Sequence, residues 1–290
     1  MLDSLSAARN NIGNRLHKNA DSSGGPSVGE ESPRAASPLL RIADVSVRFG
    51  GVRALDGVTC QVNAGEICGL IGPNGAGKTT LFNCITRLYS IASGSITFAG
   101  ARIDAIPARK IVSLGVARTF QNLGIYADMT VLENVLLGAH HTHGGRFFLT
   151  AVQPWKSDAQ EREMTEWCRS ILRTLDLDVL EHERAGNLPY GTLKRVEIAR
   201  ALAAKPRLLL LDEPAAGLNH GERIEFGNLI KRIREEFDLT ILLVEHQMGL
   251  VMGLCGRLLV LHLGQLLAEG APAEISANPA VVTAYLGEAA

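Results

Sequence analysis

The sequence has no apolar run long enough to span a membrane. A spanning helix needs about 20 consecutive apolar residues, whereas apolar segments such as Leu208–Leu211 and Thr240–Val244 contain only a few. The N-terminus also lacks the apolar core of a secretion signal. We therefore expect any work at a membrane to be done through protein partners.

Cysteine is sparse, and neither sign of charge dominates. The five cysteines are odd in number and far apart, with no Cys-x-x-Cys pair. This spacing argues against a disulfide framework or a zinc site and favours a reducing compartment. The net charge is −1. Because duplex nucleic acid is bound mainly through basic surfaces, this balance argues against a nucleic-acid partner.

The residues that are present suffice for a sizeable core. Of the 290 residues 46% are hydrophobic and 20% are charged, as in ordinary globular proteins. Residues 1–38 are rich in Ser, Asn, Gly and Pro without periodicity, so we expect a disordered N-terminal extension. A short helix over Leu2–Leu16 with an interaction role is the alternative. The folded domain is expected over residues 39–290.

Strand and helix patterns alternate along that domain. Helices are predicted from about Lys78 and around Glu222–Phe237, and the stretch between about Thr130 and Leu202 has mostly helical spacing. The predicted strands are Leu40–Phe49, Val58–Val62, Ile67–Ile71, Ser95–Phe98, Leu208–Leu211 and Thr240–Val244. Such alternation predicts an α/β fold with a largely parallel sheet.

A glycine-rich loop follows one of the buried strands. Residues 72–79 read GPNGAGKT and fit the pattern G-x-x-x-x-G-K-[ST] between a strand and a helix, the context that a phosphate-binding loop requires. The glycines let backbone N–H groups point at phosphate oxygens, and the helix N-terminus adds a positive partial charge. We expect Lys78 at the β- and γ-phosphates and Thr79 at Mg²⁺. The nucleotide-binding candidates are Gly72, Pro73, Asn74, Gly75, Ala76, Gly77, Lys78, Thr79 and Thr80.

Two adjacent carboxylates follow another buried strand. Four leucines precede Asp212 and Glu213, and open α/β sheets bind ligands at the carboxyl ends of their strands. Asp212 is expected in the Mg²⁺ shell, and Glu213 is placed to polarise an attacking water as general base. An exposed acidic turn is the alternative, which the phosphate-binding loop upstream disfavours. These two elements alone do not separate a GTPase, a kinase and a transport ATPase.

The segment before these carboxylates carries a family resemblance. Residues 188–202 read LPYGTLKRVEIARAL and resemble the signature motif and helix of ATP-binding cassette (ABC) ATPases. Other family marks occur in order: Phe49 matches the aromatic that stacks on adenine, and Gln121 matches the Q-loop glutamine. Residues 215–219 look like the D-loop, and His246 matches the switch histidine. The chain is therefore identified as a member of this family over nearly its whole folded domain.

The resemblance implies a RecA-like parallel-sheet core, an antiparallel β subdomain and an α-helical subdomain at about residues 128–203. It implies ATP hydrolysis with Glu213, His246 and Lys78 as the catalytic residues. The Mg²⁺ site would comprise Thr79, Gln121 and Asp212. According to the resemblance, the signature residues face the ATP held by a partner subunit and are Leu188, Pro189, Tyr190, Gly191 and Thr192. The D-loop residues are Ala216, Gly217, Leu218 and Asn219.

Several details look like the ATP-binding subunit of branched-chain amino acid importers. They are the Tyr-Gly variant of the signature, Gly72–Thr80, Arg118–Gln121, Glu213–Asn219, Glu245-His246 and the terminal Ala284–Glu288. This resemblance implies a second ATPase subunit, two membrane permease subunits and, indirectly, a solute-binding protein, at the cytoplasmic face of the inner membrane. Related systems for urea, amides or lipopolysaccharide are the alternatives. A non-transport ABC ATPase is disfavoured because the chain has neither coiled-coil insertions nor paired cassettes.

Pro189 departs from the family pattern. The usual signature has serine there, whose hydroxyl contacts the γ-phosphate held by the opposite subunit, and proline has neither that hydroxyl nor a backbone N–H. We expect the composite site that uses this signature to be the weaker of two, as suits a heterodimer.

Two further segments lie between the motifs. The apolar residues Leu123, Ile125 and Tyr126, after Gln121, are the expected groove for a permease helix. The histidines at 140, 141 and 143 suggest a metal site, but without Cys or carboxylates at matching spacing an exposed loop is favoured.

Overall fold

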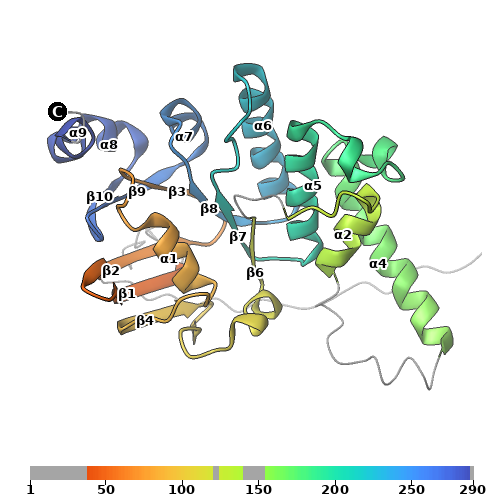
Figure 1. Cartoon of the computed structure of the whole chain (residues 1–290), viewed down its shortest axis with the longest axis horizontal. Helices are drawn as coiled ribbons and strands as arrows, with labels where there is room; N and C mark the ends of the chain where they lie inside the picture. Colours follow the sequence, from red (N-terminus) through yellow and green to blue (C-terminus); the bar gives the residue numbers. More distant parts are fainter. Residues whose placement is uncertain (1–37, 120–123, 140–153, 288–290) are drawn as a thin grey trace, which may run out of the picture. The chain divides into compact units, whose positions relative to one another are not determined.

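The chain forms two β-sheets and a set of helices in the parts that the computed structural model describes, residues 38–119, 124–139 and 154–287 (Figure 1). One sheet has four strands in the order β2-β1-β4-β5, and the other has six in the order β10-β9-β3-β8-β7-β6. Residues 1–37 of the predicted extension lie outside the described residues, whereas Pro38, predicted to belong to the extension, is the first residue of a strand.

The four-stranded sheet is antiparallel throughout. Its strands are β1 (Pro38–Phe49), β2 (Val52–Asn63), β4 (Ser93–Phe98) and β5 (Ala101–Arg102). The turn at Gly50-Gly51 joins β1 to β2, and Gly50 has φ +57°, a conformation that favours glycine. Leu40, Ile42 and Val45 of β1 are buried, so one face of this sheet packs on the core.

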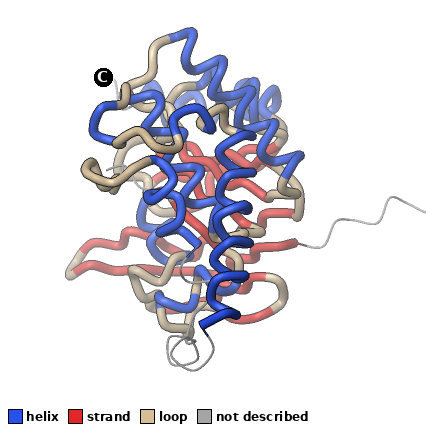
Figure 2. The backbone as a smooth tube through the Cα atoms, turned by 90° about the vertical axis from the view of Figure 1, so that its right-hand side faces the viewer, coloured by secondary structure: helices blue, strands red, loops and turns tan. Residues whose placement is uncertain are grey.

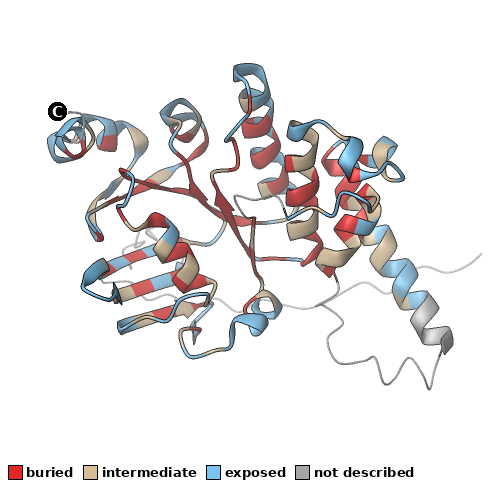
Figure 3. Ribbon diagram, viewed as in Figure 1, coloured by how far each residue is buried: buried red, intermediate tan, exposed pale blue. Residues whose placement is uncertain are grey.

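The six-stranded sheet is parallel except at one edge, where β10 runs antiparallel to β9. Its strands are β3 (Ile67–Ile71), β6 (Val116–Arg118), β7 (Leu208–Asp212), β8 (Thr240–Val244), β9 (Arg257–His262) and β10 (Gln265–Gly270). Every residue of β3, β7 and β8 is buried, as the red central strands of Figure 3 show. Continuous apolar runs suit such strands because both faces are covered.

Alternate residues of these strands enter two separate cores, because successive side chains point to opposite faces of a sheet. Leu208 and Leu210 join a cluster with β1, β2 and α1 (Lys78–Ile85). Leu209 and Leu211 join a second cluster with the remaining helices. The six-stranded sheet thus has the antiparallel sheet and α1 on one face and most helices on the other.

The helices of the second core fall into two groups. The helices α2 (Val131–Ala139), α4 (Pro154–Thr174) and α5 (Tyr190–Ala203) lie within the range expected for the helical subdomain, whose boundaries we keep as a proposal. Seen from the side of α4, these helices lie in front of the strands (Figure 2). The others are α6 (His220–Glu236), α7 (Met248–Leu254), α8 (Pro272–Ala277) and α9 (Pro279–Leu286). No helix of the described residues is both long and apolar enough for a bilayer crossing.

Candidate nucleotide site

The glycine-rich loop joins β3 to α1 as predicted. The strand ends at Ile71 and the helix begins at Lys78, with Gly77 at its N-cap. Gly72, Gly75 and Gly77 have φ values of +147°, +78° and +104°. Side chains with a Cβ rarely adopt such backbone angles, so the glycines fix the curve of the loop.

Neighbouring backbone atoms pack tightly against the glycine-rich loop. A Cβ on Gly72 would lie 2.0 Å from the carbonyl oxygen of Leu261, and one on Gly77 would lie 2.7 Å from that of Ala54. The turn between β9 and β10 supports the same place, because Gly264 N–H donates to the carbonyl of Ala76 at 3.1 Å. The loop therefore rests on β2 and on the β9–β10 turn.

Lys78 lies inside the curve of this loop. Its side chain is buried, and Nζ donates to the carbonyl oxygens of Gly72 at 2.7 Å and Pro73 at 2.8 Å. Asn74 and Thr79 are exposed on the same loop and at the first turn of α1. The ammonium group is thus held at a fixed place in the loop.

Glu213 and His246 meet at the carboxyl edge of the sheet. They follow the neighbouring strands β7 and β8, whose residues Asp212 and Val244 are in register. Glu213 has φ +47°, and its N–H donates to the carbonyl of Val244 at 2.9 Å. Its Oε1 lies 2.7 Å from Nε2 of His246, and the two side chains are 26% and 41% exposed. The pair is therefore fixed by backbone geometry and open to solvent.

Asp212 has one oxygen occupied and the other unpartnered. Oδ2 accepts a hydrogen bond from Arg118 at 2.7 Å, in an ion pair whose side chains are 6% and 1% exposed. Arg118 also donates to Oδ1 of Asn83 in α1 at 2.6 Å. Within the described residues Oδ1 of Asp212 is buried without a hydrogen-bond partner. Because buried polar atoms are nearly always satisfied, this oxygen fits a role as ligand of a hard cation such as Mg²⁺.

The predicted signature and D-loop pack on each other within the chain. The helix α5 begins at Tyr190, and Pro189 is its N-cap, with φ −57° and no side-chain cap. Gly217 has φ +81°, and a Cβ on it would lie 2.9 Å from Cε1 of Tyr190. Asn219 caps α6 and forms a capping box with Glu222. Leu218 is buried, while Ala216 and Gly217 are exposed.

Phe49 offers an exposed ring at the end of β1. It is 47% exposed, and its ring contacts that of Tyr89 edge to face, with centroids 5.0 Å apart. Tyr89 follows α1, so the chain segment after this helix fixes the ring of Phe49. An aromatic face of this kind can stack on a nucleotide base.

The family follows from a comparison with known proteins. The family model described as ABC transporter matches residues 55–216, more than half of the chain, including the loop, the signature segment and the Asp212-Glu213 pair. This chain belongs to the ABC transporter family.

Curated and solved members of this family are similar over most of the chain. The protein BraF of Pseudomonas aeruginosa, described as a high-affinity branched-chain amino acid transport ATP-binding protein, is 43% identical over 255 residues, which are 87% of this chain and 99% of BraF. LivG of Escherichia coli (strain K12), with the same description, is 41% identical and covered completely by 88% of this chain. An ATP-binding cassette of an ABC transporter solved in its ADP conformation has a TM-score of 0.75 at 35% identity, covering 86% of this chain and 99% of that one.

The C-terminal segment matches a narrower group of ABC proteins. A family model described as branched-chain amino acid ATP-binding cassette transporter matches residues 265–290. This segment contains β10, α8 and α9 in its described part. The predicted fold class and family membership are confirmed by these comparisons.

Some predicted site residues lie outside the described residues. They are Gln121 and Leu123, together with the histidines at 140, 141 and 143. Of the neighbouring groove residues, Tyr126 is 58% exposed. Ile125 is partly buried against the helical core, so it contributes less surface than predicted.

The structure adds four residues to the candidate site through contacts that the sequence alone does not reveal. Arg118, Glu245 and Tyr89 contact site residues, and Arg200 of the signature helix donates to the carbonyl of Gly124 at 2.6 Å. Burial of Arg200 lowers the pKa of its guanidinium. A charged residue next to the end of an apolar strand was the available signal for Arg118 and Glu245.

The cysteines take no part in this chemistry. All five are buried, and burial raises the pKa of Cys60 and Cys255 to about 12 and that of Cys84 in α1 to about 11. Thiols with such pKa values are mostly protonated at neutral pH and are poor nucleophiles.

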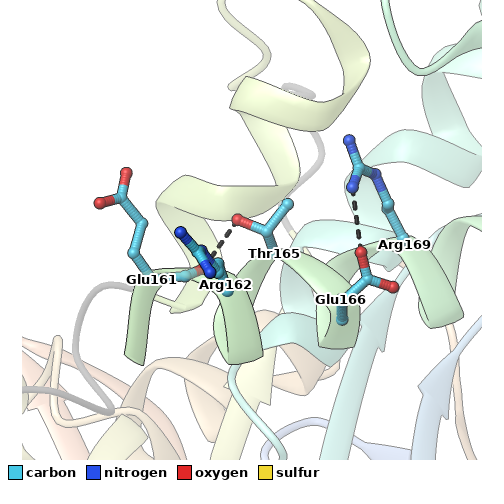
Figure 4. A pocket seen from close by; sticks show the side chains of 5 residues that line it. All are labelled: Glu161, Arg162, Thr165, Glu166 and Arg169. Atoms are coloured by element: carbon cyan, nitrogen blue, oxygen red, sulfur yellow. Dashed lines mark hydrogen bonds and ion pairs between the residues drawn. The ribbon is translucent and has the colours of Figure 1, made fainter. Parts of the chain in front are cut away.

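A polar hollow on α4 is separate from the nucleotide site. It is lined by residues of this one helix, as Figure 4 shows, and none belongs to the nucleotide motifs: Glu161, Arg162, Thr165, Glu166 and Arg169. Arg169 and Glu166 form an exposed ion pair at 3.0 Å across it. Such an exposed pair on a helix face stabilises little.

Proposed function

We propose that this chain is the ATP-hydrolysing subunit of a transporter that imports branched-chain amino acids. The contact between Glu213 and His246 carries the ATPase part, because it places a carboxylate and an imidazole at the sheet edge where nucleotides bind. The solute class is supported by the match of residues 265–290 and by the descriptions of BraF and LivG.

The nucleotide would lie along the phosphate-binding loop. Backbone N–H groups between Gly72 and Gly77 and the start of α1 would hold the phosphates, and Lys78 would contact the β- and γ-phosphates. The exposed ring of Phe49 would stack on adenine. Stacking of this kind contributes about 1–3 kcal/mol per base.

Mg²⁺ fits the ligands of this site. Asp212 would contribute its unpartnered Oδ1, and Thr79 and Gln121 would complete the protein side of the shell. When bound, the ion would neutralise charge on the phosphate oxygens. Arg118 holds the other oxygen of Asp212, so it orients the carboxylate for this role.

Hydrolysis needs a proton acceptor for the attacking water. Glu213 is the proposed general base, since its carboxylate is partly exposed and lies at the carboxyl end of β7. His246 holds Oε1 of Glu213 through Nε2 and so fixes the direction of the carboxylate. The N–H group of Glu213 is fixed by β8, which limits movement of the base relative to the loop.

The transporter complex would contain further subunits. A second, related ATPase would face the signature residues 188–192 and the D-loop, forming a heterodimer. Two permeases would bind near the exposed Tyr126 and hold the chain at the cytoplasmic face of the inner membrane, and a solute-binding protein would deliver the substrate.

The substitution Glu213→Gln tests the ATPase proposal. We expect turnover in the reconstituted transporter to fall by about a hundredfold or more, the contribution of general base catalysis. ATP binding should persist, and the closed dimer should accumulate because its nucleotide is not hydrolysed. Glu225→Gln is the control, since Glu225 is an exposed carboxylate of α6 paired with Arg195. Hydrolysis at the parent rate by Glu213→Gln would show that another group is the base.

A further inference from the structure

Glu245 is a buried carboxylate between the two loops that carry the catalytic pair. It is 3% exposed and directly follows β8. Its Oε1 accepts the backbone N–H of Ala215 at 2.9 Å. Its Oε2 accepts those of His246 at 3.0 Å and Gln247 at 3.3 Å. One side chain therefore binds the start of the D-loop and the switch loop together.

The partners of Glu245 differ from those of other buried carboxylates. Asp212 pairs with Arg118 at 2.7 Å, and Glu197 pairs with Lys194 at 3.8 Å. Across the described ranges Glu245 has no ion pair and is satisfied by backbone N–H groups. Burial of a carboxylate is costly unless it is hydrogen-bonded, so these three bonds and the conformations of both loops depend on one another.

We propose that Glu245 is a positioning residue that couples the D-loop to the switch histidine and so sets the contact between Glu213 and His246. The proposal rests on the proposed ATPase function. His246 directly follows Glu245, and Glu213 lies two residues before Ala215. Glu245 thus fixes the chain on both sides of the 2.7 Å contact.

The same hydrogen bonds form a path from the subunit interface to the catalytic pair. Ala215 leads directly into Ala216 and Gly217, which are exposed and would face the second ATPase subunit. A displacement of the D-loop on closure of the dimer would move the Ala215 N–H, and Glu245 would transmit it to His246. Closure would then align His246 and Glu213 only when the partner is in place.

Glu245 itself is not the general base. Both of its oxygens accept backbone hydrogen bonds, and its side chain is shielded from water. A carboxylate is nevertheless required, because both oxygens must accept. In glutamine one oxygen is replaced by an NH₂ donor, which would oppose a backbone N–H donor. Aspartate keeps both acceptors but is one methylene shorter, so it cannot reach both loops equally.

The substitution Glu245→Gln separates positioning from binding. We expect kcat for ATP hydrolysis to fall about tenfold to a hundredfold, the range for losing one or two charge-assisted hydrogen bonds. The affinity for ATP should stay within about twofold, because the phosphate-binding loop is untouched. Glu66→Gln is the control outside the site: Glu66 is a partly buried carboxylate that accepts the backbone N–H of Asn63 at 2.6 Å and pairs with Arg257, and none of these partners belongs to the D-loop or the switch loop.

Hydrogen exchange on the intact chain gives a readout that does not depend on turnover. In Glu245→Gln, amide exchange should rise together in the peptides that contain Ala215 and His246, and in Glu66→Gln it should not. A parental kcat, an equal loss of kcat and ATP affinity, or faster exchange in only one of the two loops would overturn the proposal. If Glu245→Gln does not fold, Glu245→Asp takes its place with the same readouts, expected to change in the same direction.

The results that would contradict the proposed ATPase function differ from those that would contradict the role of Glu245. Absence of ATP hydrolysis in the parent complex would remove the ATPase proposal, while the exchange measurement would still decide whether Glu245 joins the two loops. Hydrolysis at the parent rate by Glu213→Gln with a slow Glu245→Gln would retain the coupling and reassign the base.

Discussion

Pro189 stands at the position where the resemblance to the ABC signature leads us to expect a serine. It caps α5 with φ −57° and contributes no side-chain hydrogen bond. A serine there would offer a hydroxyl to the N–H groups of the first helical turn. In the proposed heterodimer it would also reach the γ-phosphate of the opposite nucleotide. The residue therefore bears both on helix stability and on the strength of one composite site.

We predict that Pro189→Ser raises the ATPase rate of the reconstituted transporter. A missing hydrogen bond to a charged group corresponds to about 1.5–3 kcal/mol, which is about tenfold to a hundredfold in the rate of that one composite site, so a gain should be measurable in steady-state hydrolysis. Pro189→Ala lacks the hydroxyl and should show no gain. A serine variant that hydrolyses no faster than the alanine variant would contradict the asymmetric arrangement.

Residues with a local signal were predictable from the sequence, and residues with distant partners were not. Lys78 and Asp212 belong to patterns whose spacing fixes their place on a loop or strand end. Arg118 and Glu245 have roles that depend on partners 94 and 30 positions away. Such partners become neighbours only once the strand order is known, and the strand order is not written in local periodicity.

At the scale of elements, the packing of α2 on α5 depends on a single glycine. A Cβ on Gly138 would lie 1.9 Å from the carbonyl oxygen of Arg200 and 2.8 Å from its carbon. Both atoms belong to helix backbone and cannot rotate away. Only a glycine at position 138 therefore allows α5 to lie this close to α2.

We predict that Gly138→Ala destabilises the chain, even though alanine favours helices. Overpacking of this kind costs about 1–3 kcal/mol, and the loss should appear as a lower urea midpoint. Gly253→Ala in α7 is the control, because a Cβ there meets nothing within 4 Å and the same change should be neutral or stabilising. Equal midpoints for the two variants would mean that α2 can shift without cost.

Strands with a continuous apolar sequence matched their predicted bounds. The predictions Ile67–Ile71 and Thr240–Val244 coincide with β3 and β8, since continuous apolar runs flanked by turns favour buried strands. The strand β6 was missed because it has three residues, and its place comes from pairing with β7. The strands β9 and β10 were missed as well, where only a short apolar run and a turn at Leu263-Gly264 mark a hairpin.

At the scale of the whole molecule, the chain before β1 is predicted to be dispensable for nucleotide binding. The first strand begins at Pro38, which pairs with Asn63, and the nucleotide residues all follow it. The sequence predicts that residues 1–38 can be removed; because Pro38 belongs to β1, the variant should start at Pro38, and we expect it to bind ATP with the affinity of the full chain, measured by fluorescence titration. Loss of folding in this variant would overturn the predicted disorder of residues 1–38, and a change confined to transport would favour the alternative interaction role.

The support of the phosphate-binding loop by the β9–β10 turn has a consequence for how members of the family diverge. The N–H of Gly264 donates to the carbonyl of Ala76 at 3.1 Å, and the carbonyl of Gly264 accepts the N–H of Asp56 at 2.8 Å. The match to branched-chain amino acid transporters begins at the next residue, 265. A chimera that exchanged residues 265–290 between relatives would therefore change the chain directly after a residue that supports the proposed phosphate-binding loop, so we expect changes in this C-terminal segment to affect ATP affinity as well.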